Sequence, residues 1–166
     1  MIQTPDITIN PHDYIANGWA LLTAGNKDHF NVMTINWGSF GFLWNKSICT
    51  VYVKPIRYTF EFLMENDYFT ISFLPEEYKK DMLIIGTKSG RDLDKLALTS
   101  LTPDSLGDTM TYKEANRTIV LKKIYASPFV KEEVPDFAHE KYYQEEAEHY
   151  MFIGEVVGIY ENRQDD

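Results

Sequence analysis

The sequence is poor in cysteine, in basic residues and in long apolar runs, and each scarcity excludes a class of protein. The lone Cys49 cannot form an intramolecular disulfide, and no basic start followed by an apolar run marks a secretory signal. The most apolar stretch, 150–160, contains Glu155 and is far shorter than the about 20 residues that cross a bilayer. We therefore expect a cytoplasmic protein with no membrane span.

The charge is one-sided. Sixteen Lys and Arg residues stand against 25 Asp and Glu residues, which gives a net charge of −9 over 166 residues. A negative field repels phosphate backbones, so neither nucleic acid nor a membrane surface is expected as a partner, and an anionic ligand would need a local basic pocket. The length predicts a single domain, 1–166, and a hydrophobic content of 44% is ample for its core.

Common catalytic signatures are also missing. The sequence contains no GxGxxG, GxxxxGKS, HExxH or GxSxG motif and no paired CxxC. Its four histidines, at 12, 29, 139 and 149, do not have the spacing of a metal site, and Cys49 in the middle of a predicted strand is expected to be buried and inert. We predict no metal and no catalytic residue of the chain's own, so the chemistry would belong to a cofactor.

Strands dominate the predicted secondary structure. The runs Trp19–Gly25 and Phe30–Trp37 flank the turn-forming letters GNKDH, which predicts a hairpin. In the second run, Met33, Ile35 and Trp37 alternate with more polar positions, as in a half-buried strand. Further strands are predicted from composition and alternation at 47–54, 68–74, 118–125 and 150–161.

Short helices are predicted between the strands. Apolar spacing indicates a helix at 59–66, and a second helix is expected to begin at Pro75 and to end at Gly86. The segment 38–41 is interpreted as a glycine-rich loop, 102–108 as a polar stretch, and 136–148 as a helical or irregular acidic piece. The fold class is mainly β with short helices, and an antiparallel barrel is preferred to a sandwich.

Four segments could carry a ligand. In NVMTINWGSFG (31–41), glycines would let the backbone approach a flat ligand, although for this segment taken alone a core strand ending in a loop is the simpler interpretation. In KPIRYT (54–59), two cations and a hydroxyl precede a helix, as at a phosphate site or at an idle solvated turn. In SGRDLDK (89–95), three polar or basic side chains could reach an anion or could only cap and pair on the surface. His149 opens an apolar strand and could be purely structural.

In combination and in this order, the motifs NxMTxxW, KPxRYT, SGRDxDK and HxxFIGEV resemble the flavin reductase-like family, whose fold is the FMN-binding split barrel. The resemblance runs from about Trp19 to about Tyr160 and is nearest to the flavoredoxin-type branch. It implies a homodimer of antiparallel split β-barrels that bind FMN near the dimer interface, with NAD(P)H as the hydride donor.

The resemblance also implies a set of cofactor-binding residues. The first strand would line the flavin, the next two motifs would bind the phosphate and ribityl region, and the last would contribute a contact near the ring or across the dimer: Asn31, Thr34 and Trp37; Lys54, Arg57, Thr59, Ser89 and Lys95; and His149. Asn36 departs from the pattern, because similar sequences often carry Ser there, and this could alter a hydrogen bond to the flavin.

Three functions remain open at this point. The chain could be an NAD(P)H:flavin oxidoreductase, an electron-transfer or flavin-storage protein without NAD(P)H turnover, or a barrel that has lost its flavin. No nicotinamide fingerprint indicates NADH or NADPH. The acceptor is not indicated either, and the charge of −9 suggests only that an electron-acceptor protein would be basic.

Overall fold

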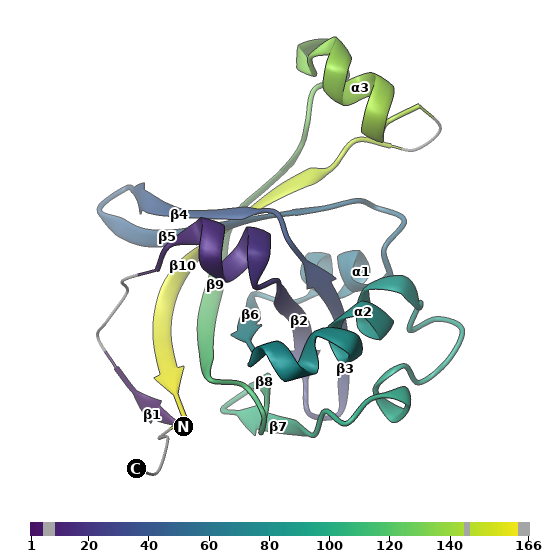
Figure 1. Cartoon of the computed structure of the whole chain (residues 1–166). Helices are drawn as coiled ribbons and strands as arrows, with labels where there is room; N and C mark the ends of the chain where they lie inside the picture. The colour runs from purple at the N-terminus through teal and green to yellow at the C-terminus, as the bar shows by residue number, and fades with distance from the viewer. Residues whose placement is uncertain (5–8, 145–146, 163–166) are drawn as a thin grey trace.

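A computed structural model describes residues 1–4, 9–144 and 147–162 of the chain. Most of its strands form one antiparallel sheet that curls around an apolar interior, with short helices packed at its margins (Figure 1). The strands are β1 (Ile2–Gln3), β2 (Ala20–Asn26), β3 (His29–Ile35), β4 (Gly38–Leu43), β5 (Lys46–Val53), β6 (Tyr68–Phe73), β7 (Pro103–Leu106), β8 (Thr109–Tyr112), β9 (Arg117–Pro128) and β10 (Tyr150–Glu161). The helices are η1 (His12–Asn17), α1 (Tyr58–Glu65), η2 (Glu76–Tyr78), α2 (Lys79–Thr87), η3 (Leu96–Leu98), η4 (Lys131–Glu133) and α3 (Asp136–Tyr142).

The large sheet has the strand order β3-β2-β6-β9-β10-β5-β4, and β1 pairs with the end of β10. All of its pairings are antiparallel. Its two ends, β3 and β4, are consecutive in the chain and are joined by Asn36 and Trp37. The architecture is the predicted antiparallel split β-barrel, and the link between its two end strands lies in a segment that the sequence motifs single out.

The predicted hairpin is confirmed as β2 and β3, with Leu22 paired to Met33. Its turn is shaped by Asn26, whose side-chain oxygen accepts hydrogen bonds from the backbone N–H groups of Asp28 and His29. The strands expected at 47–54, 68–74, 118–125 and 150–161 are confirmed as β5, β6, β9 and β10. The helix expected at 59–66 is confirmed as α1.

The core follows from strand alternation. Alternate residues of β2, β5, β6 and β9 point inward and are almost fully buried, among them Leu22, Val51, Ile71 and Leu121. A second, smaller cluster lies on the outer side of the β2–β3 hairpin, where Leu21 and Val32 pack against α2 and Tyr112. The hairpin is therefore covered on both of its faces.

This double cover corrects the prediction of a half-buried strand at 30–37. Val32, placed on the more polar face, is 1% exposed because α2 packs over it. Trp37, placed on the apolar face, lies beyond the end of β3 and is 39% exposed. Alternation of apolar and polar residues predicts burial correctly when one face of a sheet is exposed to water. The prediction fails where a helix covers that face as well.

The prediction that Gly86 ends the second helix is wrong, because α2 continues to Thr87. A Cβ at Gly86 would lie 3.2 Å from Cβ of Thr34, so the glycine allows a close approach between α2 and β3. The Thr34 hydroxyl donates to the carbonyl oxygen of Met82 in the same contact. The helix and the strand that carries the first motif are thus held together.

Other segments differ from expectation. The segment 38–41 is not a loop but part of β4, which pairs with β5 along its whole length, so its glycines lie in a regular ladder. The polar stretch 102–108 contributes β7 and the turn of a two-stranded hairpin with β8, in which Gly107 has a φ of +61°. Within 136–148, α3 is helical, and residues 145–146 lie outside the described part of the chain.

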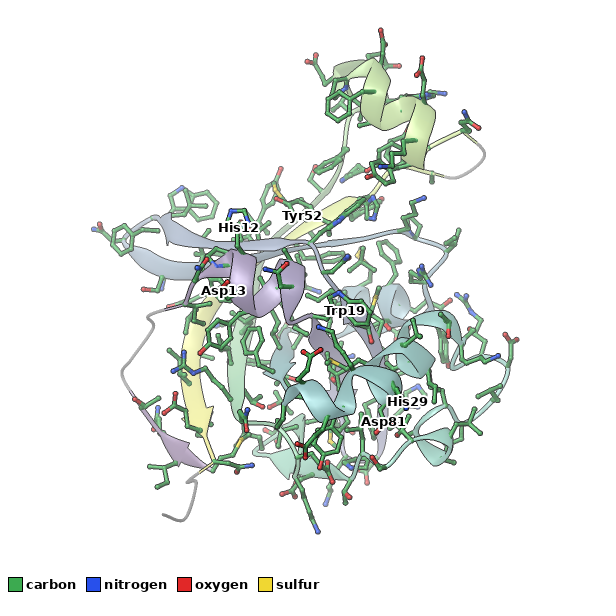
Figure 2. The ribbon with its side chains drawn as sticks, viewed as in Figure 1. His12, Asp13, Trp19, His29, Tyr52 and Asp81 are labelled. Atoms are coloured by element: carbon green, nitrogen blue, oxygen red, sulfur yellow. The ribbon has the colours of Figure 1, made fainter. Side chains whose placement is uncertain are left out.

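The helix α3 stands away from the body of the barrel at the ends of β9 and β10 (Figure 1). We call residues 129–144 the arm. Near the N-terminus, η1 leads into Trp19 (Figure 2). The ring of Trp19 lies 4.6 Å from Nζ of Lys79. None of the helices in the described residues is long and apolar enough to cross a membrane.

Candidate functional site

Two adjoining pockets border β3 and share Met33 and Arg57 in their linings. The ring pocket has a volume of about 250 Å³ and lies at the β3–β4 link, beneath the arm. The anion pocket has a volume of about 140 Å³ and lies between β3, the start of α1 and the segment after α2. Each name states the kind of ligand group that suits the side chains lining the pocket.

The structure gathers all of the sequence-predicted site residues around these two pockets. Those that line the ring pocket are Thr34, Trp37, Lys54 and His149, those that line the anion pocket are Asn31, Thr59, Ser89 and Lys95, and Arg57 lines both. These side chains come from segments up to about two thirds of the chain apart, and the barrel brings them together. Their assignment as flavin contacts stays a prediction.

The ring pocket has an aromatic wall. The ring of Trp37 lies edge-on to Tyr142 with centroids 5.0 Å apart, and it lies 5.2 Å from the ring of His149. Lys54 Nζ donates a 2.7 Å hydrogen bond to the carbonyl oxygen of Tyr142, which ties the arm to β5. Such a wall suits a planar aromatic ligand, because offset and edge-on ring contacts favour flat partners.

His149 is held by a neighbour that the sequence analysis did not consider. The hydroxyl oxygen of Tyr143 lies 2.7 Å from Nδ1 of His149, and Lys54 Nζ lies 5.3 Å from the centre of the Tyr143 ring. Burial raises the pKa of Tyr143 above the ordinary value of a tyrosine. The pair of tyrosines at 142–143 within an acidic segment was the available signal for this part of the site.

The anion pocket is basic. Arg57, Lys88 and Lys95 line it together with the hydroxyl side chains of Thr59, Thr87 and Ser89, a set of donors that suits a phosphate. Among the described residues, neither pocket has an Asp or a Glu in its lining. The chain as a whole has a net charge of −9, so the positive charge of this pocket is opposite in sign to that of the rest of the protein.

Lys95 is the most buried of these cations, with 5% of its surface exposed. Its Nζ donates hydrogen bonds to the carbonyl oxygens of Ile85 (3.1 Å) and Lys88 (3.2 Å), which places it against the end of α2. Burial, and then the nearby charge of Arg57, lower the pKa of Lys95 to about 8. A bound anion would offset both effects.

Close packing shapes the floor of the anion pocket. Asn31 Nδ2 donates a 2.7 Å hydrogen bond to Oγ1 of Thr59, which joins β3 to α1. A Cβ on Gly90 would collide with Oδ1 of Asn31, so a side chain at this position would displace Asn31 or the backbone around Gly90. The residues that sequence reasoning missed here include Lys88 and Thr87, which add a cation and a hydroxyl group to the lining. They also include Met33, Ile56 and Tyr58, which carry no chemical signature of their own.

The described residues contain no group of three or more His, Cys, Asp or Glu side chains that could hold a metal ion. Cys49 is buried in β5 and its thiol pKa is raised by that burial, so it has no place in the site. What the arrangement can do chemically is hold a flat ring at one end and a phosphate at the other.

Residues 12–166 match the family described as flavin reductase like domain. No curated protein matches the sequence. Among solved structures, the fold is similar to that of flavoredoxin from Methanosarcina acetivorans, with a TM-score of 0.69, 23% identity and coverage of 97% of this chain and 77% of that one. An FMN-binding protein from Thermus thermophilus has a TM-score of 0.69 at 20% identity, with coverage of 99% and 83%. Flavoredoxin of Desulfovibrio vulgaris has a TM-score of 0.67 at 24% identity, with coverage of 89% and 73%.

Proposed function

Because the chain belongs to the flavin reductase-like domain family, we propose that it binds FMN across the ring and anion pockets and passes reducing equivalents from NAD(P)H to an acceptor. The observation that carries the proposal is the anion pocket. Three cationic side chains meet there without a carboxylate in the described lining, in a protein that is otherwise strongly acidic. A phosphate monoester attached to a flat ring fits this pair of pockets.

In the proposed complex, Arg57 and Lys95 neutralise the phosphate, and the hydroxyl groups of Thr59 and Ser89 add neutral hydrogen bonds. Arg57 borders both pockets, so its charge also reaches the junction between phosphate and ring. Thr59 already accepts a hydrogen bond from Asn31, which fixes the position of its hydroxyl group before any ligand binds.

Trp37, His149 and the arm residue Tyr142 would enclose the ring from one side. When bound, FMN supplies the hydride and electron chemistry, and the chain's own residues need only orient the ring and exclude water from it. We therefore assign no catalytic residue. Asn36 lines the ring pocket and would offer an amide where similar sequences often carry Ser.

An electron-transfer or flavin-storage protein is the second candidate. It is a candidate because the similar structures include two flavoredoxins and an FMN-binding protein as well as flavin reductases. Both candidates require the same two pockets, and they differ only in turnover. A flavin-free barrel is the third, and the basic lining of the anion pocket argues against it.

We further propose a homodimer and, as the acceptor, a small molecule or a basic electron-transfer protein that the charge of −9 would attract. Several large apolar side chains are exposed on the single chain, among them Phe42, Trp44 and Phe137, and a partner copy would cover such groups. Light scattering should give twice the mass of one 19.3 kDa chain. The mass of one chain would contradict the dimer.

The test of the function is a visible absorption spectrum of the purified protein before and after incubation with FMN and desalting. Retained flavin bands are expected, and their absence together with no binding in a titration would overturn FMN binding. Steady-state oxidation of NADH and of NADPH with added flavin then separates the candidates. Turnover supports the oxidoreductase, and bound flavin with negligible turnover supports the carrier.

A further inference from the structure

The arm meets the barrel through two adjacent tyrosines that make different contacts. The ring of Tyr142 packs nearly perpendicular to that of Trp37, and its carbonyl oxygen accepts the hydrogen bond from Lys54. Tyr143 is 7% exposed, and its hydroxyl oxygen lies 2.7 Å from Nδ1 of His149. The arm thus reaches a histidine of the ring pocket through one buried hydroxyl group.

The backbone of His149 is fixed at the base of the arm. Its carbonyl oxygen accepts a 2.9 Å hydrogen bond from the backbone N–H of Phe129, and the next residue, Tyr150, pairs with Pro128 where β10 begins. The arm leaves the barrel at this point, at the ends of β9 and β10 (Figure 1). Because the backbone holds His149 beside the arm, the bond with Tyr143 acts on the imidazole ring itself.

The hydrogen bond between Tyr143 and His149 has a preferred direction. A neutral imidazole has one N–H donor and one acceptor nitrogen, and a tyrosine hydroxyl ordinarily carries its proton at neutral pH. Burial raises the pKa of Tyr143, and the backbone N–H of His149, which acts on the same hydroxyl oxygen, partly lowers it. The oxygen therefore already serves as an acceptor. Among the described residues, Nδ1 of His149 is the one side-chain acceptor within hydrogen-bond distance of the hydroxyl proton.

This direction determines what His149 contributes to the ring pocket. If Nδ1 accepts the hydroxyl proton, the single N–H of the neutral imidazole is at Nε2, on the opposite side of the ring from Tyr143. The hydroxyl of Thr34, which also lines the pocket, donates its own proton to the carbonyl oxygen of Met82. Thr34 therefore meets a ligand as an acceptor, whereas His149 meets it as a donor.

We infer that Tyr143 is a positioning residue of the ring pocket. By donating to Nδ1 it holds the proton of His149 at Nε2, so that the pocket gains an N–H donor for an acceptor atom at the edge of a bound ring while the arm lies against the barrel. The identity of the bound ring rests on the proposed function. The position of the proton on His149 does not, because it follows from contacts within the chain.

The first test is nuclear magnetic resonance of the full chain without FMN, labelled with ¹⁵N at its four histidines. At about pH 8, where histidine is neutral, we expect Nδ1 of His149 to have the shift of an unprotonated nitrogen and Nε2 that of a protonated one. His149→Gln identifies the signals by deleting them. Tyr143→Phe removes only the hydroxyl group and should move both His149 shifts.

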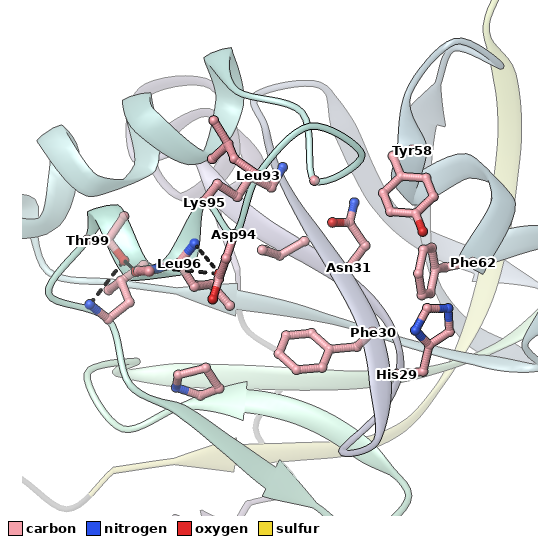
Figure 3. Close-up of a pocket in the computed structure, with 15 residues that line it drawn as sticks. His29, Phe30, Asn31, Tyr58, Phe62, Leu93, Asp94, Lys95, Leu96 and Thr99 are labelled. Carbon is pink, nitrogen blue, oxygen red and sulfur yellow. Dashed lines mark hydrogen bonds between the residues drawn. The ribbon is translucent and has the colours of Figure 1, made fainter.

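Two controls accompany this test. The ring of His29 packs against that of Phe62 with centroids 4.6 Å apart, at the other end of β3 from the ring pocket (Figure 3), so its shifts should stay the same in Tyr143→Phe and report an intact fold. Tyr125→Phe is the matched variant. Tyr125 lines the same apolar pocket beside the arm as Tyr143 but is 41% exposed, and its loss of a hydroxyl group should leave His149 unchanged.

The second test is titration with FMN. Tyr143→Phe should weaken FMN binding about threefold to tenfold, the effect of losing one well-placed neutral hydrogen bond, and Tyr125→Phe should not. A protonated Nδ1 in the wild type, or His149 shifts that are the same in Tyr143→Phe, would overturn the inference and leave the proposed function intact. Moved shifts with unchanged FMN affinity would also overturn it, since the donor would then not serve the ligand. If the wild type binds no FMN but its His149 proton is at Nε2 and depends on Tyr143, the proposed function fails and the positioning role of Tyr143 stands.

Discussion

Asn31 Nδ2 lies 2.7 Å from Oγ1 of Thr59 and donates a hydrogen bond to it, although the two residues are in different elements of the barrel. Both side chains are buried, with 7% and 1% of their surfaces exposed. Because buried polar groups need hydrogen-bond partners, this bond fixes the distance between β3 and the first turn of α1. The width of the anion pocket depends on it.

Gly90→Ala should disturb this bond. The new Cβ would meet Oδ1 of Asn31 at 2.2 Å, so Asn31 or the 88–91 backbone must move and the anion pocket must deform. We expect FMN affinity to fall about tenfold or more, measured by titration. Gly41→Ala is the control, because a Cβ there meets Ile48 only at ordinary contact distance. Equal affinities for both variants would show that the pocket does not need this close packing.

Arg57→Gln and Lys95→Met each remove one positive charge from the anion pocket while keeping a side chain of similar length. Hydrogen bonds to charged groups contribute about 1.5–3 kcal/mol each, so FMN affinity should fall about tenfold to a hundredfold. Riboflavin, which has no phosphate, should bind all variants alike. Lys122→Gln, at an exposed position of β9, is the charge-matched control. A parallel loss of riboflavin binding would place these cations elsewhere than at the phosphate.

FMN affinity should fall as the pH rises from 7 to 9. Burial and Arg57 lower the pKa of Lys95 to about 8, so its charge is lost in this range. The phosphate is doubly ionised above its second pKa of about 6 and does not change. Titrations at several pH values should show the decline in the wild type and a flatter profile in Lys95→Met. An identical decline in both would remove Lys95 as its cause.

The same lowered pKa has an opposite effect on the stability of the ligand-free protein. Between about 8 and the usual 10.5, the unfolded chain keeps the Lys95 proton that the folded chain has released. Stability rises with pH wherever the unfolded state binds more protons, so the contribution of Lys95 rises across this window. Urea unfolding at pH 7.5 and 9.5, with Lys95→Met as the reference, measures the difference.

Tyr112→Phe should destabilise the protein without touching the site. The Tyr112 hydroxyl lies 3.0 Å from Oγ1 of Thr23, and both residues are 1% exposed. The substitution leaves a buried threonine hydroxyl without this partner, which costs about 1–3 kcal/mol. Urea unfolding should show a lower midpoint with an unchanged slope. Tyr68→Phe, at a half-exposed tyrosine of β6, should change the midpoint little.

Cys49 should not react with an aromatic disulfide reagent in the native protein and should react fully in denaturant. It is 0% exposed, and burial raises its thiol pKa, so little thiolate forms and no reagent reaches it. Following the absorbance of the released thiol measures both states. Rapid reaction of the native protein would mean that β5 opens far more readily than its place between β10 and β4 implies.

The elements that were predicted correctly and those that were missed differ in how far apart in the chain their stabilising residues lie. Elements whose signal is local were predicted well, such as the β2–β3 hairpin around Asn26, the helix α1, and β10 with its bounds at Tyr150 and Glu161. Elements that depend on remote partners were missed. β4 is a strand because β5 pairs with its glycines, and Val32 is buried because α2 covers it.

The candidate site shows the same division. Asn31, Arg57 and Lys95 were identified from their motifs and do lie together around the two pockets. Tyr142 and Tyr143 were not, because a pair of tyrosines in an acidic segment does not by itself indicate that the arm reaches Lys54 and His149. Gly86 was interpreted as a helix stop, and only its contact with Thr34 reveals its role in packing.

The sequence by itself determined the chemistry that is available: the acidic charge, the single inert cysteine, the order of the motifs and the alternation that makes a barrel. Only the tertiary structure decided that cations from two separate segments, Arg57 from one and Lys88 and Lys95 from the other, line a pocket with no carboxylate in its described lining, and that this pocket adjoins the ring pocket. The reason is that periodicity and turn residues act over a few neighbours, whereas a pocket is made by strand pairing between residues far apart in the chain.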